Sequence, residues 1–196
     1  KEKIARTCLR MGASQEVAEA VAEKIKRKAH EGIKSKQILN MIFRHLARYR
    51  GKVKSHIDLR RALGLMRPKP DFEQFVHILL REHDYEVTPN LIVRGKCVEH
   101  EVDAIARKDG KTYAVEVKHH FNHHALTGLD VSRIARAIFE DITEGFELGL
   151  NSTSLEKAIV ICNTKYSDHA KRYGECRGIA QIGWNYPAQH GLEDMI

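Results

Sequence analysis

Three residues in the second half of the chain carry side chains that hydrolytic chemistry uses. Glu116 and Lys118 stand two apart in the apolar run YAVEVK, and Asp103 lies in the earlier run HEVDAIA. Carboxylate oxygens are hard ligands that suit Mg²⁺ or Mn²⁺. An ammonium group beside them can orient a water molecule and offset negative charge in a transition state. The set therefore indicates metal-assisted hydrolysis of a phosphate ester.

Two strands joined by the turn KDGK would bring these side chains together. Alternation along a strand places Glu101 and Asp103 on one face, and it places Glu116, Lys118 and His120 on one face of the next strand. An antiparallel hairpin can then bring Asp103 beside Glu116 and Lys118. The triplet E-x-K is common, so the spacing alone also allows a structural role without catalysis. In that alternative, Lys118 forms a salt bridge with Glu116 or Asp103 on a solvated face of the hairpin.

Four histidines follow in the stretch HHFNHH: His119, His120, His123 and His124. Their H-x3-H spacing would bind zinc only on a helix that aligns them, and this stretch leaves a strand for a loop. A zinc hydrolase built on these histidines is therefore a separate hypothesis. We expect His120 to lie beside Lys118, where it could contact a phosphate of the substrate or tune a water molecule.

Charge divides the chain into two parts. The net charge of +7 is the sum of +13 over residues 1–70 and −6 over residues 71–196. A basic module suits the phosphates of a nucleotide or a nucleic acid, although a solvated, lysine-rich helical surface would look the same. The first ten residues hold no apolar core of a signal peptide, and no apolar run is long enough to cross a bilayer. We expect a cytoplasmic protein without a membrane partner.

Apolar spacing predicts a small helical bundle over residues 1–66. The expected helices cover residues 4–12, 14–32, 35–51 and 55–65, with Ser14, Ser35 and Ser55 as N-caps. Two prolines flank Lys69, which favours extended chain. Residues 67–70 are therefore the predicted linker between two domains.

Residues 71–196 change to an α/β pattern. A helix from Asp71 precedes three short strands, and helices and apolar strands then alternate to the end, with Ser167 as a further N-cap. The order α-β-β-β-α-β-α-β predicts a mixed β-sheet flanked by helices on both faces.

The ordered motifs of this second domain resemble the PD-(D/E)xK nuclease superfamily, in particular Mrr-like restriction endonuclease domains. The pattern is D-x(12)-E-V-K, preceded by a helix carrying FEQFVHILL and followed by AIVICNTKYSDHAKRYGECRGIAQIGW. Val102 stands where the motif often has proline. The resemblance implies a metal-dependent nuclease.

The same resemblance implies roles for individual residues. Asp103 and Glu116 would bind Mg²⁺ or Mn²⁺ with the backbone carbonyl of Val117. Lys118 would act on the attacking water, and Glu73 would assist the first metal ion or bind a second one.

The first domain resembles an ATP-cone, the nucleotide-sensing module known from ribonucleotide reductases, in the helical run from EKIARTCLRMG to RHLARYRG. The β-hairpin that opens this module is missing from the sequence. The resemblance implies ATP or dATP as an effector, with Lys3 and Arg6 facing its phosphates and Arg48 and Arg50 as further candidates.

These patterns together predict a metal-dependent DNA endonuclease that is regulated by ATP or dATP. Lys165 joins His120 as an expected contact with DNA, and the resemblance to restriction nucleases implies a homodimer. The alternative function is a catalytically inactive, nucleotide-responsive DNA-binding protein.

Overall fold

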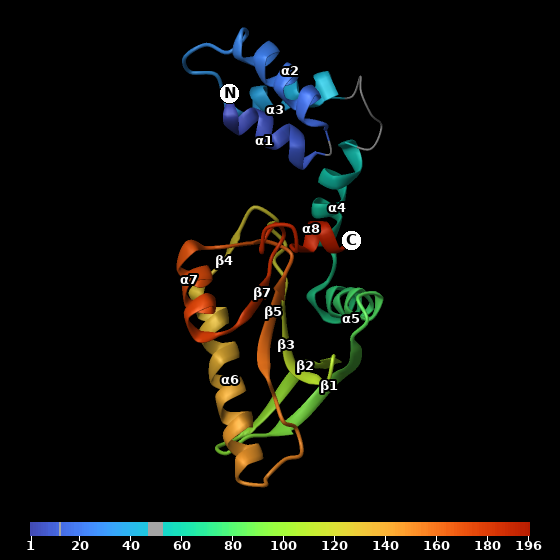
Figure 1. Ribbon diagram of the computed structural model, residues 1–196, viewed down its shortest axis with the longest axis vertical. Helices are drawn as coiled ribbons and strands as arrows, with labels where there is room; N and C mark the ends of the chain where they lie inside the picture. Colours follow the sequence, from blue (N-terminus) through green and yellow to red (C-terminus); the bar gives the residue numbers. More distant parts are fainter. Residues whose placement is uncertain (12, 47–52) are drawn as a thin grey trace. The chain divides into compact units, whose positions relative to one another are not determined.

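The computed structural model describes residues 1–11, 13–46 and 53–196, and it divides the chain into two compact units, Lys1–Leu59 and Arg60–Ile196 (Figure 1). Helix α4 (Val53–Leu65) begins in the first unit and ends in the second. This division lies ahead of residues 67–70, and the functional assignment of the two domains stays a prediction. Gly12, Arg48 and Arg50 lie outside the described residues.

The first unit contains a bundle of short helices. They are α1 (Glu2–Arg10), α2 (Gln15–Lys26) and α3 (Ser35–Leu46). Their apolar faces meet in a core that includes Cys8, Val21, Ile25, Ile42 and Leu46. The predicted cap at Ser14 is confirmed, because its Oγ accepts a hydrogen bond from the Val17 N–H. Since α4 already begins at Val53, the predicted cap at Ser55 is wrong.

The second unit is built around one five-stranded sheet. Its strands are β1 (Glu86–Arg94), β2 (Glu99–Lys108), β3 (Lys111–Lys118), β5 (Lys157–Cys162) and β7 (Ala180–Ile182). They lie in that order across the sheet, antiparallel from β1 to β3 and parallel from β3 to β7. The short strands β4 (Leu126–Thr127) and β6 (Lys165–Tyr166) form a separate pair. The predicted mixed α/β class is confirmed.

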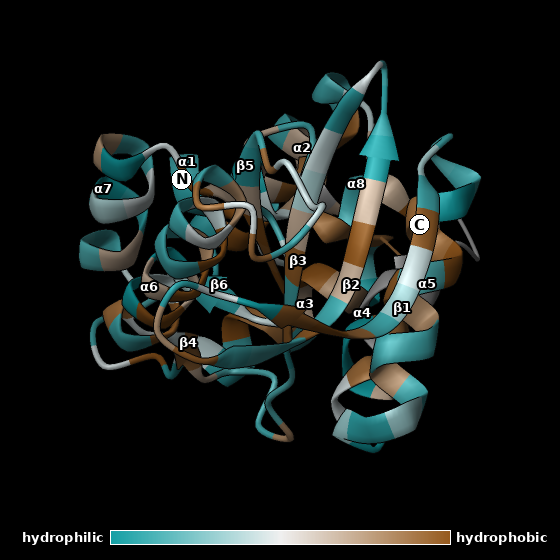
Figure 2. Cartoon of the chain, turned by 90° about the horizontal axis from the view of Figure 1, so that it is seen from below, coloured by the Kyte–Doolittle hydropathy of each residue, from teal (hydrophilic) through white to brown (hydrophobic). Residues whose placement is uncertain are grey.

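Helices cover both faces of this sheet. They are α5 (Glu73–Glu82), α6 (Leu129–Glu147), α7 (Asp168–Arg177) and the short α8 (Leu192–Met195). Figures 1 and 2 show α6 and α7 to one side of the strands and α5 to the other, with the hydrophobic segments of β2 and β3 between them. The cap at Ser167 is confirmed by its hydrogen bond from the Ala170 N–H. No described helix is long and apolar enough to span a membrane.

The C-terminal part of α6 fixes the β1–β2 hairpin. The Asp141 carboxylate accepts hydrogen bonds from the backbone N–H groups of Cys97 (2.8 Å) and Val98 (3.3 Å) and from His100 Nε2 (2.8 Å). These hydrogen bonds hold the pKa of Asp141 well below its ordinary value, and the bond from the Cys97 N–H has the largest effect. The hairpin that carries Asp103 is therefore tied to the helix behind it.

Replacing Gly145 with alanine is expected to destabilise the protein by about 2 kcal/mol. A Cβ at this position of α6 would lie 2.8 Å from the backbone carbon of Gly95 and 3.0 Å from the Arg94 carbonyl oxygen. Helix propensity alone would instead stabilise the variant by about 1 kcal/mol. Urea unfolding of both proteins measures the difference, and a more stable variant would contradict this close packing.

The proline-rich segment before α5 is kinked. Pro68–Phe72 contains Lys69 in an extended conformation (φ −119°, ψ 135°), as predicted. The predicted cap at Asp71 is wrong. Its carboxylate instead accepts two hydrogen bonds from the Arg67 guanidinium, at 2.8 and 2.9 Å, and the residue directly before α5 is Phe72.

Candidate active site

Asp103 lies where strands β2 and β3 separate. Their paired residues end at Ala104 and Val115, while β3 continues beside β5 as far as Lys118. The Val117 N–H on this side donates to Asp103 Oδ2 at 2.8 Å. Because the N–H and C=O of one strand residue point to the same side, the Val117 carbonyl is directed toward Asp103 as well. The carboxylate thus replaces a missing strand partner.

The register places Asp103, Glu116 and Lys118 on one face of the hairpin, as the sequence predicts. They line a pocket of about 440 Å³. Its other lining residues are Pro68, Lys69, Glu73, Glu101, Val117, His119 and Ile138. Asp103 and Glu73 are buried, whereas Lys118 is exposed. The pocket therefore has an acidic floor with an exposed lysine on its wall.

Glu116 is the most strongly perturbed carboxyl group of this pocket. Burial, followed by the charge of Asp103, raises its pKa from 4.5 to about 7. The cations that oppose this shift are Lys118 and Lys69. The pocket thus holds more negative charge than these two cations balance.

Stability without metal ions is expected to fall as the pH rises from 4.5 to 7. Over this range folded Glu116 keeps a proton that the unfolded chain has already lost, so each step up in pH favours unfolding. The shift in the pKa of Glu116 corresponds to a loss of roughly 3 kcal/mol in the free energy of unfolding across this pH range. Urea unfolding in EDTA at several pH values measures it. Glu116→Gln should remove this part of the slope, and an unchanged slope would contradict the assigned pKa.

Lys69 joins the pocket from the kinked segment. Its Nζ lies 3.0 Å from Glu101 Oε1, 3.2 Å from Glu73 Oε1 and 3.4 Å from Asp103 Oδ1. The hydrogen bond to Glu101 is the main reason why the pKa of Lys69 is raised. Burial, and then the charge of Asp103, raise the pKa of Glu73. Sequence reasoning missed Lys69, although its spacing of four residues from Glu73 was a usable signal.

His77 holds the backbone at Asp103. This buried residue of α5 donates from Nε2 to the Asp103 carbonyl oxygen at 3.1 Å, and burial lowers its pKa. A neutral ring in this position keeps the strand and the helix in register without adding charge to the pocket. The sequence showed His77 only as a polar residue within an apolar helix face.

The four clustered histidines do not converge on one point, although the rings of His123 and His124 pack against each other with centroids 4.2 Å apart. His119 Nε2 donates to the Leu63 carbonyl oxygen (2.8 Å), and His120 Nε2 contacts Thr127 Oγ1 (3.1 Å). The His123 carbonyl accepts a hydrogen bond from Arg60 of α4. Within residues 1–11, 13–46 and 53–196, no three or more His, Cys, Asp or Glu side chains form a group able to hold a metal ion.

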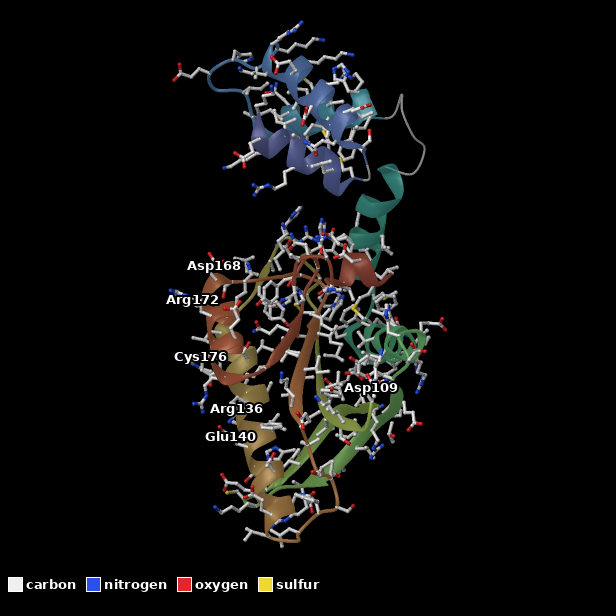
Figure 3. The ribbon with its side chains drawn as sticks, viewed as in Figure 1. Asp109, Arg136, Glu140, Asp168, Arg172 and Cys176 are labelled. Atoms are coloured by element: carbon white, nitrogen blue, oxygen red, sulfur yellow. The ribbon has the colours of Figure 1, made fainter. Side chains whose placement is uncertain are left out.

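The remaining candidate phosphate contacts are spread over both units. In the second unit, Lys165 pairs with Leu126 between β6 and β4 and does not line the pocket. Figure 3 shows Arg172 on the outer side of α7. In the first unit, Lys3 is exposed on α1, and Arg6 donates to Glu2 Oε1 at 2.8 Å. Within the second unit, the pocket brings together Asp103, Glu116, Lys118 and Glu73.

The donor set fits a hard divalent cation. Asp103 and Glu116 offer carboxylate oxygens, and Mg²⁺ is commonly held by one or two carboxylates with water completing its shell. The backbone carbonyl of Val117 can add a third oxygen. The raised pKa of Glu116 also indicates that a further positive charge would be favourable here.

Two proteins are similar to this chain over about three fifths of its length. The chain is 39% identical over 119 residues to an uncharacterized protein of Archaeoglobus fulgidus, covering 60% of this chain and 63% of the relative. The crystal structure of a protein of unknown function, AF1548, aligns with 37% identity and a TM-score of 0.56 over 63% of this chain and 62% of that one. The chain thus spans less than two thirds of both proteins.

A more distant structure covers nearly all of the chain. Can2 from Sulfobacillus thermosulfidooxidans, in complex with cyclic tetra-adenylate, aligns over 99% of this chain and 53% of its own, with 12% identity and a TM-score of 0.46. This likeness is too weak to assign any property to the chain.

One family model covers the site itself. The model Mrr_cat, described as a restriction endonuclease, matches residues 66–182, a span that contains Lys69, Glu73, Asp103, Glu116 and Lys118. This match extends over more than half of the chain, and the protein belongs to the Mrr_cat restriction endonuclease family.

Proposed function

We propose that this protein hydrolyses phosphodiester bonds of DNA in a reaction that requires Mg²⁺ or Mn²⁺. The observation that carries the proposal is the juxtaposition of Asp103, Glu116 and Lys118 on one face of the β2–β3 hairpin, with Asp103 oriented by the Val117 N–H. Membership of a restriction endonuclease family supports the same reaction class.

Asp103, Glu116 and the carbonyl oxygen of Val117 would hold the metal ion. When bound, such an ion acts as a Lewis acid toward the phosphate and lowers the pKa of water. Asp103 is suited to this role because the Val117 N–H fixes its Oδ2, while its Oδ1 contacts the Lys69 ammonium group at 3.4 Å, in a place that another cation could take. Glu116 has to lose its proton to become a ligand, so we expect metal binding to strengthen as the pH approaches 7 and above.

Lys118 would orient the attacking water and offset the negative charge that builds up on the phosphate. Its exposure at the pocket wall supports this role, because substrate and water can reach its ammonium group. Glu73 would act from the start of α5, where its buried carboxylate faces the same pocket. We propose it as a support for the first metal ion or a ligand of a second one.

DNA would approach from the side of the pocket where Lys118 is exposed. Lys165 and Arg172 are proposed phosphate contacts outside the acidic floor, and His120 stays a proposed contact near Thr127. Each phosphate that these residues neutralise would steepen the dependence of binding on salt. A homodimer would let two such sites cut both strands.

ATP or dATP remains a proposed effector of the first unit. The exposed, basic surface of the helical bundle and the position of Lys3 on α1 support it. The alternative, an inactive DNA-binding protein, would explain the fold equally well. The retention of Asp103, Glu116 and Lys118 favours the active enzyme.

A cleavage assay tests the proposal. Supercoiled plasmid, single-stranded DNA and branched DNA are incubated with the protein in Mg²⁺, in Mn²⁺ or in EDTA, with and without ATP or dATP. The expected result is cleavage of at least one substrate in Mg²⁺ or Mn²⁺ and none in EDTA. Intact DNA in every lane, together with measurable DNA binding, would favour the inactive alternative.

A further inference from the structure

Lys69 occupies the centre of the acidic pocket. Its ammonium nitrogen lies within 3.4 Å of carboxylate oxygens from Glu73, Glu101 and Asp103. The three acids come from two elements, α5 and β2, so only the folded chain assembles them around one nitrogen. The ammonium group of Lys69 thus neutralises part of the negative charge that these carboxylates bring together.

Lys69 can leave this position more easily than the two buried acids can. The side chains of Glu73 and Asp103 are 8% and 10% exposed, whereas the side chains of Lys69 and Glu101 are 57% and 65% exposed. Asp103 is also fixed by the Val117 N–H. Lys69 enters from extended backbone at the edge of the pocket, and its four-carbon side chain is flexible. The lysine is therefore the movable partner of this cluster.

A divalent cation at Asp103 would compete with this ammonium group. Both would need the same carboxylate charge, and two cations only a few ångströms apart in a partly buried pocket repel each other strongly. A metal ion that binds here therefore gains the carboxylates only by giving up the favourable contacts of Lys69. The exchange lowers the apparent affinity for the metal ion.

We propose that Lys69 is an internal counter-ion that stabilises the metal-free pocket and is displaced when the metal ion binds. This inference rests on the proposed function, since it concerns the same carboxylates. It adds a residue from outside the D-x(12)-E-V-K motif to the site and gives it a positioning role. Lys69 keeps Asp103 and Glu73 from repelling each other until the metal ion arrives.

Lys96 offers a matched control outside the pocket. Its side chain is 51% exposed, close to the 57% of Lys69, and it pairs with Glu144 at 2.7 Å. Replacing either lysine with methionine removes one ion-paired ammonium group and keeps a side chain of similar length. Only the Lys69 variant would remove a cation from the carboxylates of the pocket.

Mn²⁺ binding is measured by calorimetry for the wild type, Lys69→Met, Lys96→Met and Asp103→Asn. Lys69→Met is expected to bind Mn²⁺ about tenfold more tightly than the wild type, and Lys96→Met within about threefold of it. In EDTA, Lys69→Met should unfold at a lower temperature than the wild type, and saturating Mn²⁺ should restore its stability.

The outcomes separate this inference from the proposed function. Equal or weaker binding by Lys69→Met, or an equal gain in Lys96→Met, would overturn the role of Lys69 as a counter-ion while the metal site stands. Absence of Mn²⁺ binding by both the wild type and Lys69→Met would overturn both proposals. Binding that is lost in Asp103→Asn and strengthened in Lys69→Met supports both.

Discussion

Replacing Asp103 with asparagine is expected to lower the initial rate of DNA cleavage by at least about 1000-fold, which corresponds to ~4 kcal/mol of transition-state stabilisation. The amide keeps the size of the carboxyl group and can still accept the hydrogen bond from the Val117 N–H. What the variant loses is the negative charge that a metal ion requires. Initial rates on the best substrate of the DNA panel, at saturating Mg²⁺, measure the effect.

Asp109 provides the matched control for this experiment. It lies in the turn between β2 and β3, is exposed, and adopts a positive φ of 52°, which asparagine tolerates well (Figure 3). Asp109→Asn should therefore cleave at the wild-type rate. Asp103→Asn should be about as stable as the wild type in EDTA, because the repulsion from Glu116 and Glu73 that it relieves offsets the ion pair with Lys69 that it loses. Equal cleavage rates of the two variants would contradict a role for Asp103 in catalysis.

Replacing Lys118 with methionine is expected to lower the cleavage rate about 100-fold, the effect of removing one preorganised donor from a developing charge. DNA affinity should change by less than about tenfold, because one cation among several contributes a single phosphate contact. Single-turnover cleavage and fluorescence anisotropy with labelled DNA separate the two effects. A large loss of rate with little loss of binding identifies a group that acts in the transition state.

Lys96→Met serves as the control for charge removal. Lys96 pairs with Glu144 at 2.7 Å, is 51% exposed, and belongs to the β1–β2 hairpin instead of the pocket. Its loss should leave both rate and DNA binding near the wild-type values. If Lys118→Met cleaves DNA as fast as Lys96→Met does, Lys118 has no part in the chemistry.

The central part of the candidate site followed from local rules. Alternation along two strands and a short turn were enough to bring Asp103, Glu116 and Lys118 to one face. These rules work because residues close in sequence fix the register of a hairpin. The roles of the three residues are not determined by this geometry and stay predictions.

The rest of the site depends on contacts that local patterns do not encode. Lys69 reaches Glu101, 32 positions away in the sequence, from a segment interpreted as a linker. His120 was expected beside Lys118 by alternation, but β3 already ends at Lys118. The position of His120 is set by Asn163, which binds its backbone N–H and carbonyl, and by Thr127, which its ring contacts. The charge of Lys118 still acts on this ring, since it adds to burial in lowering the pKa of His120. Tertiary contacts thus decide both positions.

Anomalous diffraction from crystals of the wild-type protein grown with Mn²⁺ would test the central claim most directly. The prediction is a manganese peak in contact with the carboxylates of Asp103 and Glu116, with Lys69 withdrawn from Asp103. Manganese bound only elsewhere on the protein, with Lys69 still between Glu73 and Asp103, would contradict the assignment of this pocket as a metal-dependent nuclease site.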